Sequence, residues 1–315
     1  MEHQNTVASP ASLSGIGLHT GVPVTLRLCP AASNTGIVFR RTDLDGFEIR
    51  ARARNVAHVS YATSLMRRGV LISTTEHLLS ALAASRVDNV CVELDNLELP
   101  IMDGSALPFF QLIRKAGLRP QRARRTYAKL LRPVEVADGA KRIAAYPSEA
   151  FSVGYRIVFP HPLIGEQSLE FVTGQGKAAE VGSLAADYET AIAPARTFGF
   201  IEEVEKLRRN GLIRGGSLKN AVVLTRDGVM NSEGLRFPDE FCRHKILDLM
   251  GDLALLGYPL IARIVAERAG HAMHAALVGR LLREKTAWTL VGSSEVRPDD
   301  RADRAGALTR AAAAS

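Results

Sequence analysis

Cysteine is scarce in this chain of 315 residues. The three cysteines, Cys29, Cys91 and Cys242, lie far apart and are odd in number. This usage argues against a disulfide framework of the kind that staples small secreted domains, and it indicates a reducing compartment. The opening MEHQNTVASPASLSG also lacks the basic and apolar segments of a secretory signal. We therefore predict a cytoplasmic protein.

Long apolar runs and aromatic residues are also missing. No stretch approaches the roughly 18 to 20 apolar residues that a membrane-spanning helix needs. Aromatic residues make up 6% of the chain, although its formal charge is +7. Nucleic-acid binding would require basic residues interleaved with stacking aromatics, and the densest basic run, 119–133, holds one tyrosine. The charge favours solubility and attraction to anions, or more specifically an anionic substrate such as a phosphate ester or nucleotide.

Several familiar catalytic signatures are absent. The sequence contains no H-E-x-x-H, no Cys-x-x-Cys and no G-x-S-x-G. Their absence argues against a metalloprotease helix of that type, a dithiol redox motif and a serine nucleophile on a strand-to-helix elbow. Serine nucleophile chemistry in particular has no signature in this sequence.

The pattern of apolar residues predicts an α+β fold. Both halves mix strands with a few helices, without the regular βαβ alternation of a doubly wound sheet. The expected strands are 24–30, 35–41, 89–94, 130–139, 142–147, 151–160 and 260–267, and the expected helices are 72–85, 200–210, 237–256 and 271–284. The helix near 200–210 has glutamates early, basic residues late and Gly211 after its end, an order that complements the helix dipole.

The length predicts two domains of ordinary size. The basic, proline-bracketed run 119–133 has the composition of a solvated connector and marks the boundary. We expect an N-terminal α+β domain over 1–126, a linker over 127–133 and a C-terminal α+β domain over 134–296. The charged and alanine-rich segment 297–315 has the composition of a frayed, disordered tail. No sequence repeat is visible, although the similar content of the two halves is compatible with a structural duplication.

The segment RHKILDLMGD (243–252) carries a titratable side chain at every fourth position, in His244, Asp248 and Asp252. Residues four apart in a helix lie about 6 Å apart along the axis and are rotated by about 40°. His244 and Asp248 can thus reach one metal ion, whereas Asp252 is rotated too far and is better suited to orient another group. The competing interpretation is a polar stripe on an amphipathic helix, with Lys245 as ordinary helix surface.

A second candidate pair is Glu76 and His77, within STTEHLL (73–79). In the first turn of a helix the positive helix end keeps His77 neutral, as a metal ligand requires, and Glu76 beside it supplies a general base. The alternative is structural, because Ser73 followed by Glu76 has the spacing of a reciprocal capping box.

The third candidate is AERAGHAMHAAL (266–277), in which Gly270 precedes His271 at a predicted strand-to-helix turn. A histidine in such a turn is often a satisfied surface residue, and His274 follows one turn later. If His271 is a general acid, its ring needs a carboxylate to hold it, and Asp252 is available for that role.

Taken together, these segments resemble a known family. The resemblance covers about residues 5 to 292 and rests on motifs that occur in order: GIGLHTG (15–21), NTGIVFRRTDL (34–44), ISTTEHLLSAL (72–82), MDGSALPF (102–109), ARTFGF (195–200), GGS (215–217), RHKILDLMGDL (243–253) and AGHA (269–272). The sequence is similar to the zinc-dependent UDP-3-O-acyl-N-acetylglucosamine deacetylases of lipid A biosynthesis. The resemblance implies two layered α+β domains packed face to face, with the active site in the cleft between them.

The resemblance also implies roles for the candidates. One zinc ion per chain would be held by His77, His244 and Asp248. Glu76 would be the general base that activates water, and His271 the cation that stabilises the oxyanion and protonates the leaving amine. The remaining implied roles are those of Asp252, which orients His271, Thr197, a hydroxyl donor to the oxyanion, and Lys245, which lies near the diphosphate or sugar.

The implied substrate is UDP-3-O-acyl-N-acetylglucosamine, whose N-acetyl group is hydrolysed to give acetate. An insert over about 198–225, which includes Phe198, Gly216 and Ser217, would line a passage for the acyl chain. The residues expected to meet the uridine and diphosphate are Phe159 and Arg268, with His19 on the nucleotide side. We expect no nucleic-acid partner, only transient contact with a membrane surface, and a monomer.

Two other classes stay open at this point. One is a cytosolic module that binds a UDP-sugar or accompanies an acyl carrier, in which the histidines and aspartates hold only a structural metal. The other is a basic protein associated with nucleic acid. Chelator-sensitive release of acetate separates the deacetylase from the first, and salt-sensitive affinity for DNA or RNA would indicate the second.

Overall fold

The computed structural model describes residues 2–172 and 183–292, and it has the predicted α+β fold. It contains two five-stranded sheets, one from each half of the chain. The first has the order β2 (Ala11–Ile16), β3 (Pro23–Pro30), β9 (Val90–Leu94), β4 (Ile37–Arg41) and β5 (Phe47–Arg50). The second has the order β12 (Val134–Asp138), β13 (Lys141–Tyr146), β19 (Arg263–Glu267), β14 (Ser152–Val158) and β15 (Glu166–Val172).

The two sheets share one topology. In each, the central strand comes last in the sequence, runs parallel to one neighbour and antiparallel to the other, and is joined by antiparallel outer strands. In each half, one helix precedes the central strand and another follows it: α1 (Glu76–Ala84) and α2 (Leu107–Ala116), then α5 (Glu240–Leu253) and α6 (His271–Arg283). The two halves therefore share one order of strands and helices. The similar content of the two halves in the sequence is compatible with such a structural duplication.

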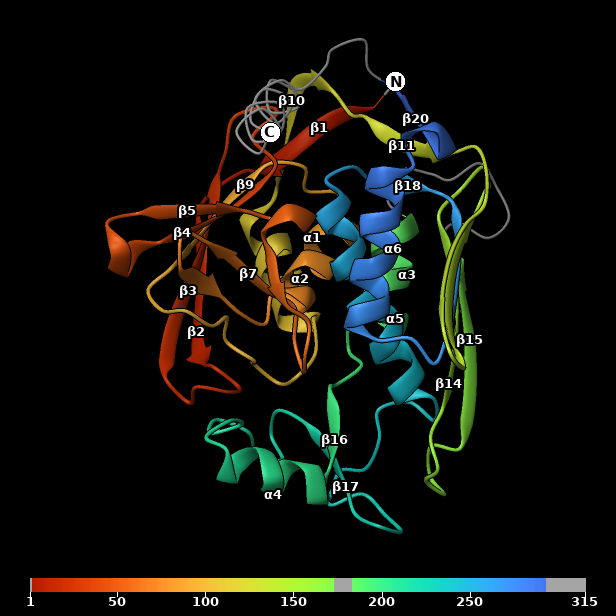
Figure 1. Ribbon diagram of the computed structural model, residues 1–315. Helices are drawn as coiled ribbons and strands as arrows, with labels where there is room; N and C mark the ends of the chain where they lie inside the picture. Colours follow the sequence, from red (N-terminus) through yellow and green to blue (C-terminus); the bar gives the residue numbers. More distant parts are fainter. Residues whose placement is uncertain (1, 173–182, 293–315) are drawn as a thin grey trace, which may run out of the picture.

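The helices form the inner layers of the molecule. Figure 1 shows α1, α2, α5 and α6 between the sheet that contains β3 and β4 and the sheet that contains β14 and β15. Strand β3 illustrates why the sheets face inward, because Val24, Leu26 and Leu28 alternate with exposed residues and are buried. The most extensive contact between the halves is that of α1 with α5.

The remaining elements close the edges of this core. They are β1 (His3–Val7) paired with β10 (Leu118–Arg124), the sheet of β18 (Leu260–Ile261), β11 (Tyr127–Leu130) and β20 (Trp288–Val291), the sheet of β6 (Val56–His58), β7 (Ser64–Arg67) and β8 (Val70–Ile72), and helix α3 (Ser183–Ala191). One-turn 3₁₀ helices occur at Thr42–Leu44, Ala53–Asn55, Ala254–Leu256 and Lys285–Ala287.

The insert forms a separate layer at one end of the molecule (Figure 1). It consists of β16 (Phe198–Phe200), which runs parallel to β17 (Val222–Leu224), and helix α4 (Ile201–Arg209) between them. Helix α4 confirms the prediction from charge order, since its first turn is acidic, its last turn is basic and Gly211 follows with a positive φ of 78°.

The basic run 119–133 is largely sheet rather than a solvated connector. Residues 118–124 form β10, which pairs with β1, and 127–130 form β11 at the centre of a three-stranded sheet. Alternating exposed arginines explain why the segment reads as solvated. The division of the chain into domains at 127–133 stays a prediction, and the predicted tail, 297–315, lies outside the described residues. Within the described residues, no helix is long and apolar enough to cross a membrane.

Gly251 allows the two central helices to approach closely. A Cβ atom at this position would lie 2.1 Å from the carbonyl oxygen of Glu76 and 3.0 Å from its Cα. Both contacts are with the backbone of α1, which cannot rotate away as a side chain can. The separation of α1 and α5 therefore depends on the absence of a side chain at Gly251.

We predict that Gly251→Ala destabilises the protein. Forcing the helices apart should lower the free energy of unfolding by about 1 to 3 kcal/mol, the usual cost of overpacking, and chemical denaturation measures it. Gly279→Ala in α6 is the matched control, because a Cβ there meets only the end of Arg283 at 3.5 Å. That control should gain up to about 1 kcal/mol from the helix propensity of alanine. Equal stability of the two variants would contradict the packing argument.

Candidate active site

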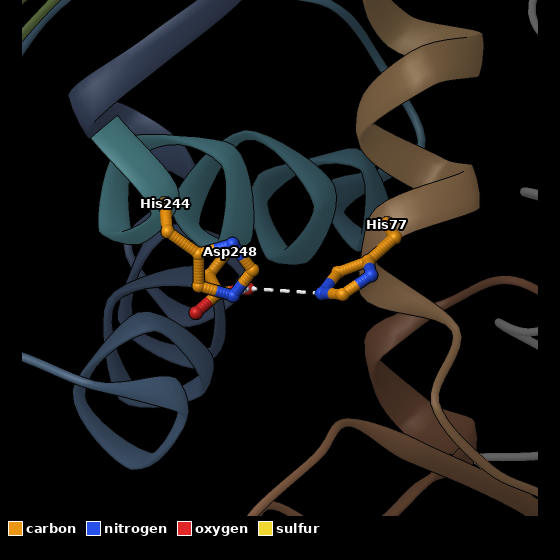
Figure 2. Close-up of side chains that lie close together, drawn as sticks. All are labelled: His77, His244 and Asp248. Carbon is orange, nitrogen blue, oxygen red and sulfur yellow. Dashed lines mark ion pairs between the residues drawn. The ribbon is translucent and has the colours of Figure 1, made fainter. Parts of the chain in front are cut away.

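Helices α1 and α5 bring three predicted metal ligands together. His77 comes from the first turn of α1, and His244 and Asp248 lie one turn apart on α5 (Figure 2). The Nε2 atoms of His77 and His244 are 3.7 and 3.4 Å from Asp248 Oδ1. The two imidazole rings meet edge to face, with centroids 5.0 Å apart. Residues separated by more than 160 positions thus converge in one buried cluster.

The polar atoms of this cluster are incompletely satisfied. His244 Nδ1 donates to the carbonyl oxygen of Ala195 at 3.1 Å, so its Nε2 faces Asp248. Lys245 Nζ donates to Asp248 Oδ2 at 2.7 Å. Asp248 Oδ1 and His77 Nδ1, however, are buried and have no hydrogen-bond partner among the described residues. An unpaired carboxylate oxygen is costly in a dry interior, which indicates that a group outside the polypeptide completes the cluster.

The geometry of the cluster fits a tetrahedral metal ion. Ligand atoms about 2.0 to 2.1 Å from zinc lie about 3.3 Å from one another, close to the distances between Asp248 Oδ1 and the histidine nitrogens. The donor set of two imidazoles and one carboxylate leaves a fourth position open, as catalytic zinc sites do.

Protonation also favours metal binding. Burial, with the nearby charge of His244, lowers the pKa of His77 to about 3, and burial likewise lowers the pKa of His244. Both rings are therefore neutral near pH 7. Burial alone would raise the pKa of Asp248, but His244 and Lys245 hold it below its ordinary value. Burial, rather than the positive helix end invoked from the sequence, is the main cause of the low pKa of His77.

A second cluster surrounds Asp252, and both oxygens of its carboxylate accept hydrogen bonds. Asp252 Oδ2 accepts from His271 Nδ1 at 2.7 Å and from His274 Nδ1 at 2.8 Å, while Oδ1 accepts from the Thr63 hydroxyl at 2.6 Å. These are ordinary hydrogen-bond lengths. His274 Nε2 also lies 3.0 Å from the Tyr155 hydroxyl. This cluster needs no metal, although its atoms are close enough to hold one.

Asp252 charges His271. Burial would lower the pKa of His271, but the carboxylates of Asp252 and Asp248 raise it to about 9. In turn, burial would raise the pKa of Asp252, but the charge and hydrogen bond of His271, with the hydrogen bond of His274, lower it to about 2. The pair is therefore an imidazolium held by a carboxylate, and His271 Nε2 lies 3.8 Å from Asp248 Oδ2 in the metal cluster.

Glu76 is not part of a capping box. Helix α1 begins at Glu76 after Thr75, without a side-chain cap, and Ser73 is hydrogen-bonded to Ser64 instead. The Glu76 carboxylate accepts from the backbone N–H of Thr63 at 3.1 Å and is buried. Burial raises the pKa of Glu76 to about 7, against the opposing charge of His271. The structural alternative for this residue is thus wrong, and its pKa suits a base near neutral pH.

The start of the insert lies beside the cluster. Thr197 directly precedes β16, and its backbone is fixed by hydrogen bonds to Gly104 and Val222. Phe198 packs against the ring of His244, with centroids 6.3 Å apart, and Lys245 Nζ lies 5.6 Å from the centre of the Phe198 ring. The insert therefore contacts the face of α5 that carries His244 and Lys245.

A largely apolar cavity of about 170 Å³ opens within the insert. Its lining includes Thr197, Phe198, Gly216 and Ser217, together with aliphatic side chains of α4 and β17. This cavity lies where the sequence predicts an acyl-chain passage.

The predicted nucleotide-side residues lie around the same region but make no single cluster. Phe159 packs against Phe198, with ring centroids 5.9 Å apart. Arg268 stands just before α6 with a positive φ of 47° and donates its backbone N–H to Arg156. His19 lines a different cavity, of about 440 Å³, between the loop 17–21 and the insert. Its Nδ1 is buried and has no hydrogen-bond partner within 2–172 and 183–292.

The sequence arguments missed several supporting residues. Thr63 joins Glu76 to Asp252, and the carbonyl of Ala195 fixes the tautomer of His244. Arg196 and Glu240 form a buried ion pair at 2.9 Å that anchors the same segment to α5. Glu240 had a visible signal, because it extends the four-residue spacing of the helix by one turn. Thr63 carried none, since its partners are far away in the sequence.

Comparison with known proteins gives one consistent result. The family described as "LpxC: UDP-3-O-acyl N-acetylglycosamine deacetylase" matches residues 4–283. Proteins named UDP-3-O-acyl-N-acetylglucosamine deacetylase are similar to the chain over most of its length. The one from Solibacter usitatus is 53% identical over 92% of this chain and 95% of its own. Those from Phenylobacterium zucineum and Syntrophotalea carbinolica are 46% and 43% identical, over 90% and 94% of this chain and 95% and 93% of theirs.

The two clusters predict different effects on metal content. If His77, His244 and Asp248 hold zinc, Asp248→Ala and His77→Ala should lower bound zinc from about one ion per chain toward none, because each removes one of the three predicted ligands. Asp252→Asn should leave the zinc content close to wild type, since the cluster of Asp252 is satisfied without metal. Elemental analysis after dialysis against a zinc buffer provides the measurement. Loss of metal from Asp252→Asn equal to that from Asp248→Ala would contradict this assignment.

Proposed function

This chain belongs to the UDP-3-O-acyl N-acetylglycosamine deacetylase family, and we propose that it hydrolyses the N-acetyl group of UDP-3-O-acyl-N-acetylglucosamine. The products are acetate and UDP-3-O-acyl-glucosamine, in an early committed step of lipid A synthesis. The observation that supports this proposal best is the unpaired Asp248 Oδ1, which faces two neutral histidines beside the buried base Glu76.

One zinc ion is the proposed cofactor, held by His77, His244 and Asp248. When bound, zinc lowers the pKa of water toward 7 and polarises a carbonyl group, which is the chemistry that amide hydrolysis requires. The donor set supports zinc because imidazole nitrogen and carboxylate oxygen are ligands it prefers. Lys245, which donates to the second oxygen of Asp248, keeps that carboxylate ionised and oriented.

Two residues move protons in the proposed reaction. Glu76 accepts a proton from the attacking water. Its pKa, raised to about 7, is close to neutral pH, so the carboxylate is both ionised in a large fraction of molecules and basic enough to take the proton. His271, cationic through Asp252, stabilises the oxyanion and donates its Nε2 proton to the leaving amide nitrogen. The two opposite roles follow from two environments, one dry and one dominated by a carboxylate.

Substrate placement is proposed for the residues around these groups. The Thr197 hydroxyl donates to the oxyanion that develops on the acetyl carbonyl. The cavity lined by Phe198, Gly216 and Ser217 takes the start of the acyl chain, since apolar walls suit an alkyl group.

The polar end of the substrate is assigned to a different set. We propose that Phe159 and Arg268 meet the uridine and diphosphate, with Lys245 near the diphosphate or sugar and His19 on the nucleotide side. A cytoplasmic location, a monomeric state and only transient contact with a membrane surface stay predictions.

Release of acetate tests the proposed function. Incubated with UDP-3-O-acyl-N-acetylglucosamine, the zinc-loaded protein should release one acetate per substrate, and a chelator should stop the release. Glu76→Gln should abolish turnover while retaining zinc, because a base is not a ligand. Binding of the substrate without chelator-sensitive release of acetate would leave a binding module as the function.

The pH dependence of kcat/KM should be bell-shaped. Activity requires ionised Glu76 and therefore rises as the pH passes about 7. It also requires protonated His271 and therefore falls as the pH passes about 9. His271→Gln should lose the basic limb and lower kcat by about 10²- to 10⁴-fold, the usual contribution of a general acid. Steady-state rates across pH 5.5 to 10 measure both limbs, and an unchanged basic limb in His271→Gln would remove this residue from the proton transfer.

A further inference from the structure

Thr74 adopts a backbone conformation that its side chain disfavours. Its φ is 59°, in the left-handed region, where a β-branched residue is rare. Thr74 lies two residues before Glu76, at the point where the chain enters α1. Such a conformation persists only when surrounding contacts fix it. Residues with a strained backbone are common at functional sites, and Thr74 adjoins the proposed one.

A buried carboxylate fixes this conformation. Glu98 is 1% exposed, and its Oε1 accepts a hydrogen bond from the Thr74 hydroxyl at 3.1 Å. The neighbouring backbones are paired as well, because Ser73 donates its N–H to Leu97 at 2.8 Å and Leu99 donates to Ser73 at 3.1 Å. Thr74 is therefore held by its side chain while the residue before it is held by its backbone.

The same carboxylate also holds a second segment. The backbone N–H groups of His19 and Thr20 donate to Oε1 and Oε2 of Glu98 at 2.9 and 2.8 Å. The insert rests on this loop, since Arg214 donates its N–H to the carbonyl of His19. Glu98 thus stands between the insert and the entry to the catalytic helix, with both of its oxygens occupied.

From this arrangement we infer that Glu98 is a positioning residue, which sets Glu76 and His77 by holding Thr74 in the left-handed conformation. Relaxation of Thr74 would turn the start of α1 and displace the base and the metal ligand together. A displacement of about 1 Å at a reacting group can lower turnover by about 100-fold. The inference rests on the proposed deacetylation for its kinetic test and on the proposed zinc ligands, but not on deacetylation, for its metal test.

Two substitutions of Thr74 separate positioning from general stabilisation. Thr74→Val and Thr74→Gly both lose the hydrogen bond to Glu98, but valine keeps the steric conflict at positive φ and glycine has none. We expect Thr74→Val to lower kcat by about 10- to 100-fold with little change in KM. Thr74→Gly should stay within about threefold of wild type, because glycine adopts the required conformation freely.

Zinc dissociation provides a readout that does not depend on turnover. With a chromogenic chelator, zinc should leave Thr74→Val about 10-fold or more faster than wild type, as when a supporting partner of a ligand is lost. It should leave Thr74→Gly at nearly the wild-type rate. A merely structural hydrogen bond predicts equal behaviour of the two variants, and equal kcat and equal zinc dissociation would overturn the inference.

Glu98 itself is tested against a remote carboxylate. Glu98→Gln offers one acceptor oxygen, which cannot accept from both the Thr74 hydroxyl and the backbone of His19 and Thr20. Therefore kcat should fall and zinc should dissociate faster. Adding Thr74→Gly to this variant should largely restore both the kcat and the rate of zinc dissociation. Asp88→Asn is the matched control, because Asp88 is also buried and accepts a backbone N–H, but it lies beyond the opposite end of α1. Equal effects of Glu98→Gln and Asp88→Asn on zinc dissociation would refute the positioning role. Absence of acetate release by wild type, with the zinc results as expected, would refute only the proposed function.

Discussion

The close contact between α1 and α5 is the constraint on which the site depends. Gly251 lets the two backbones meet at Glu76, and the same contact places His77 opposite His244 and Asp248. A wider separation would leave His77 on one side of a gap and both His244 and Asp248 on the other, too far apart for the three proposed ligands to hold a single ion. The packing of the core and the assembly of the site are therefore one requirement. Gly251 has no reactive group, but it allows the helix contact that brings the site residues together.

Burying so many titratable groups at a helix interface is costly, by several kcal/mol for each unpaired ion. The chain reduces this cost by giving each charge a partner: Lys245 for Asp248, and His271 with His274 for Asp252. Burial and neighbouring charges then give the titratable groups different pKa values. Burial raises the pKa of Glu76 and lowers that of His77, while Asp252 raises the pKa of His271. The proposed base, ligand and acid thus differ in proton affinity because of their neighbours rather than because of residue type alone.

Local sequence patterns predicted those features that depend on local geometry. The four-residue spacing of α5 was sufficient to separate the pair His244 and Asp248 from Asp252, because helix rotation fixes that relation whatever the tertiary fold. The charge order of α4 likewise located that helix. The ambiguity of Glu76 could not be settled locally, since a capping box and a buried base share one sequence spacing. Only the approach of Thr63, brought by the β6–β7–β8 sheet, decides between them.

Features that depend on long-range contacts were beyond such patterns. The run 119–133 reads as a connector because β10 lies at an edge and exposes its arginines, and its partner β1 is more than 100 residues away. The duplication was hidden for a related reason. A strand needs only alternating apolar residues to join a sheet, so two halves can keep one topology while little sequence likeness remains.

The duplication also bears on the arrangement of the proposed site. The corresponding helices, α1 and α5, contact each other across the two halves. The halves use these helices differently: α1 contributes from its first turn, where Glu76 and His77 are adjacent, whereas α5 contributes from its middle turns. Helix α6 adds His271 at its N-terminus, while α2 begins with Leu107 and Pro108. The contact between the helices thus supplies the enclosed interface, and the different side chains of the two halves supply the proposed ligands, base and acid within it.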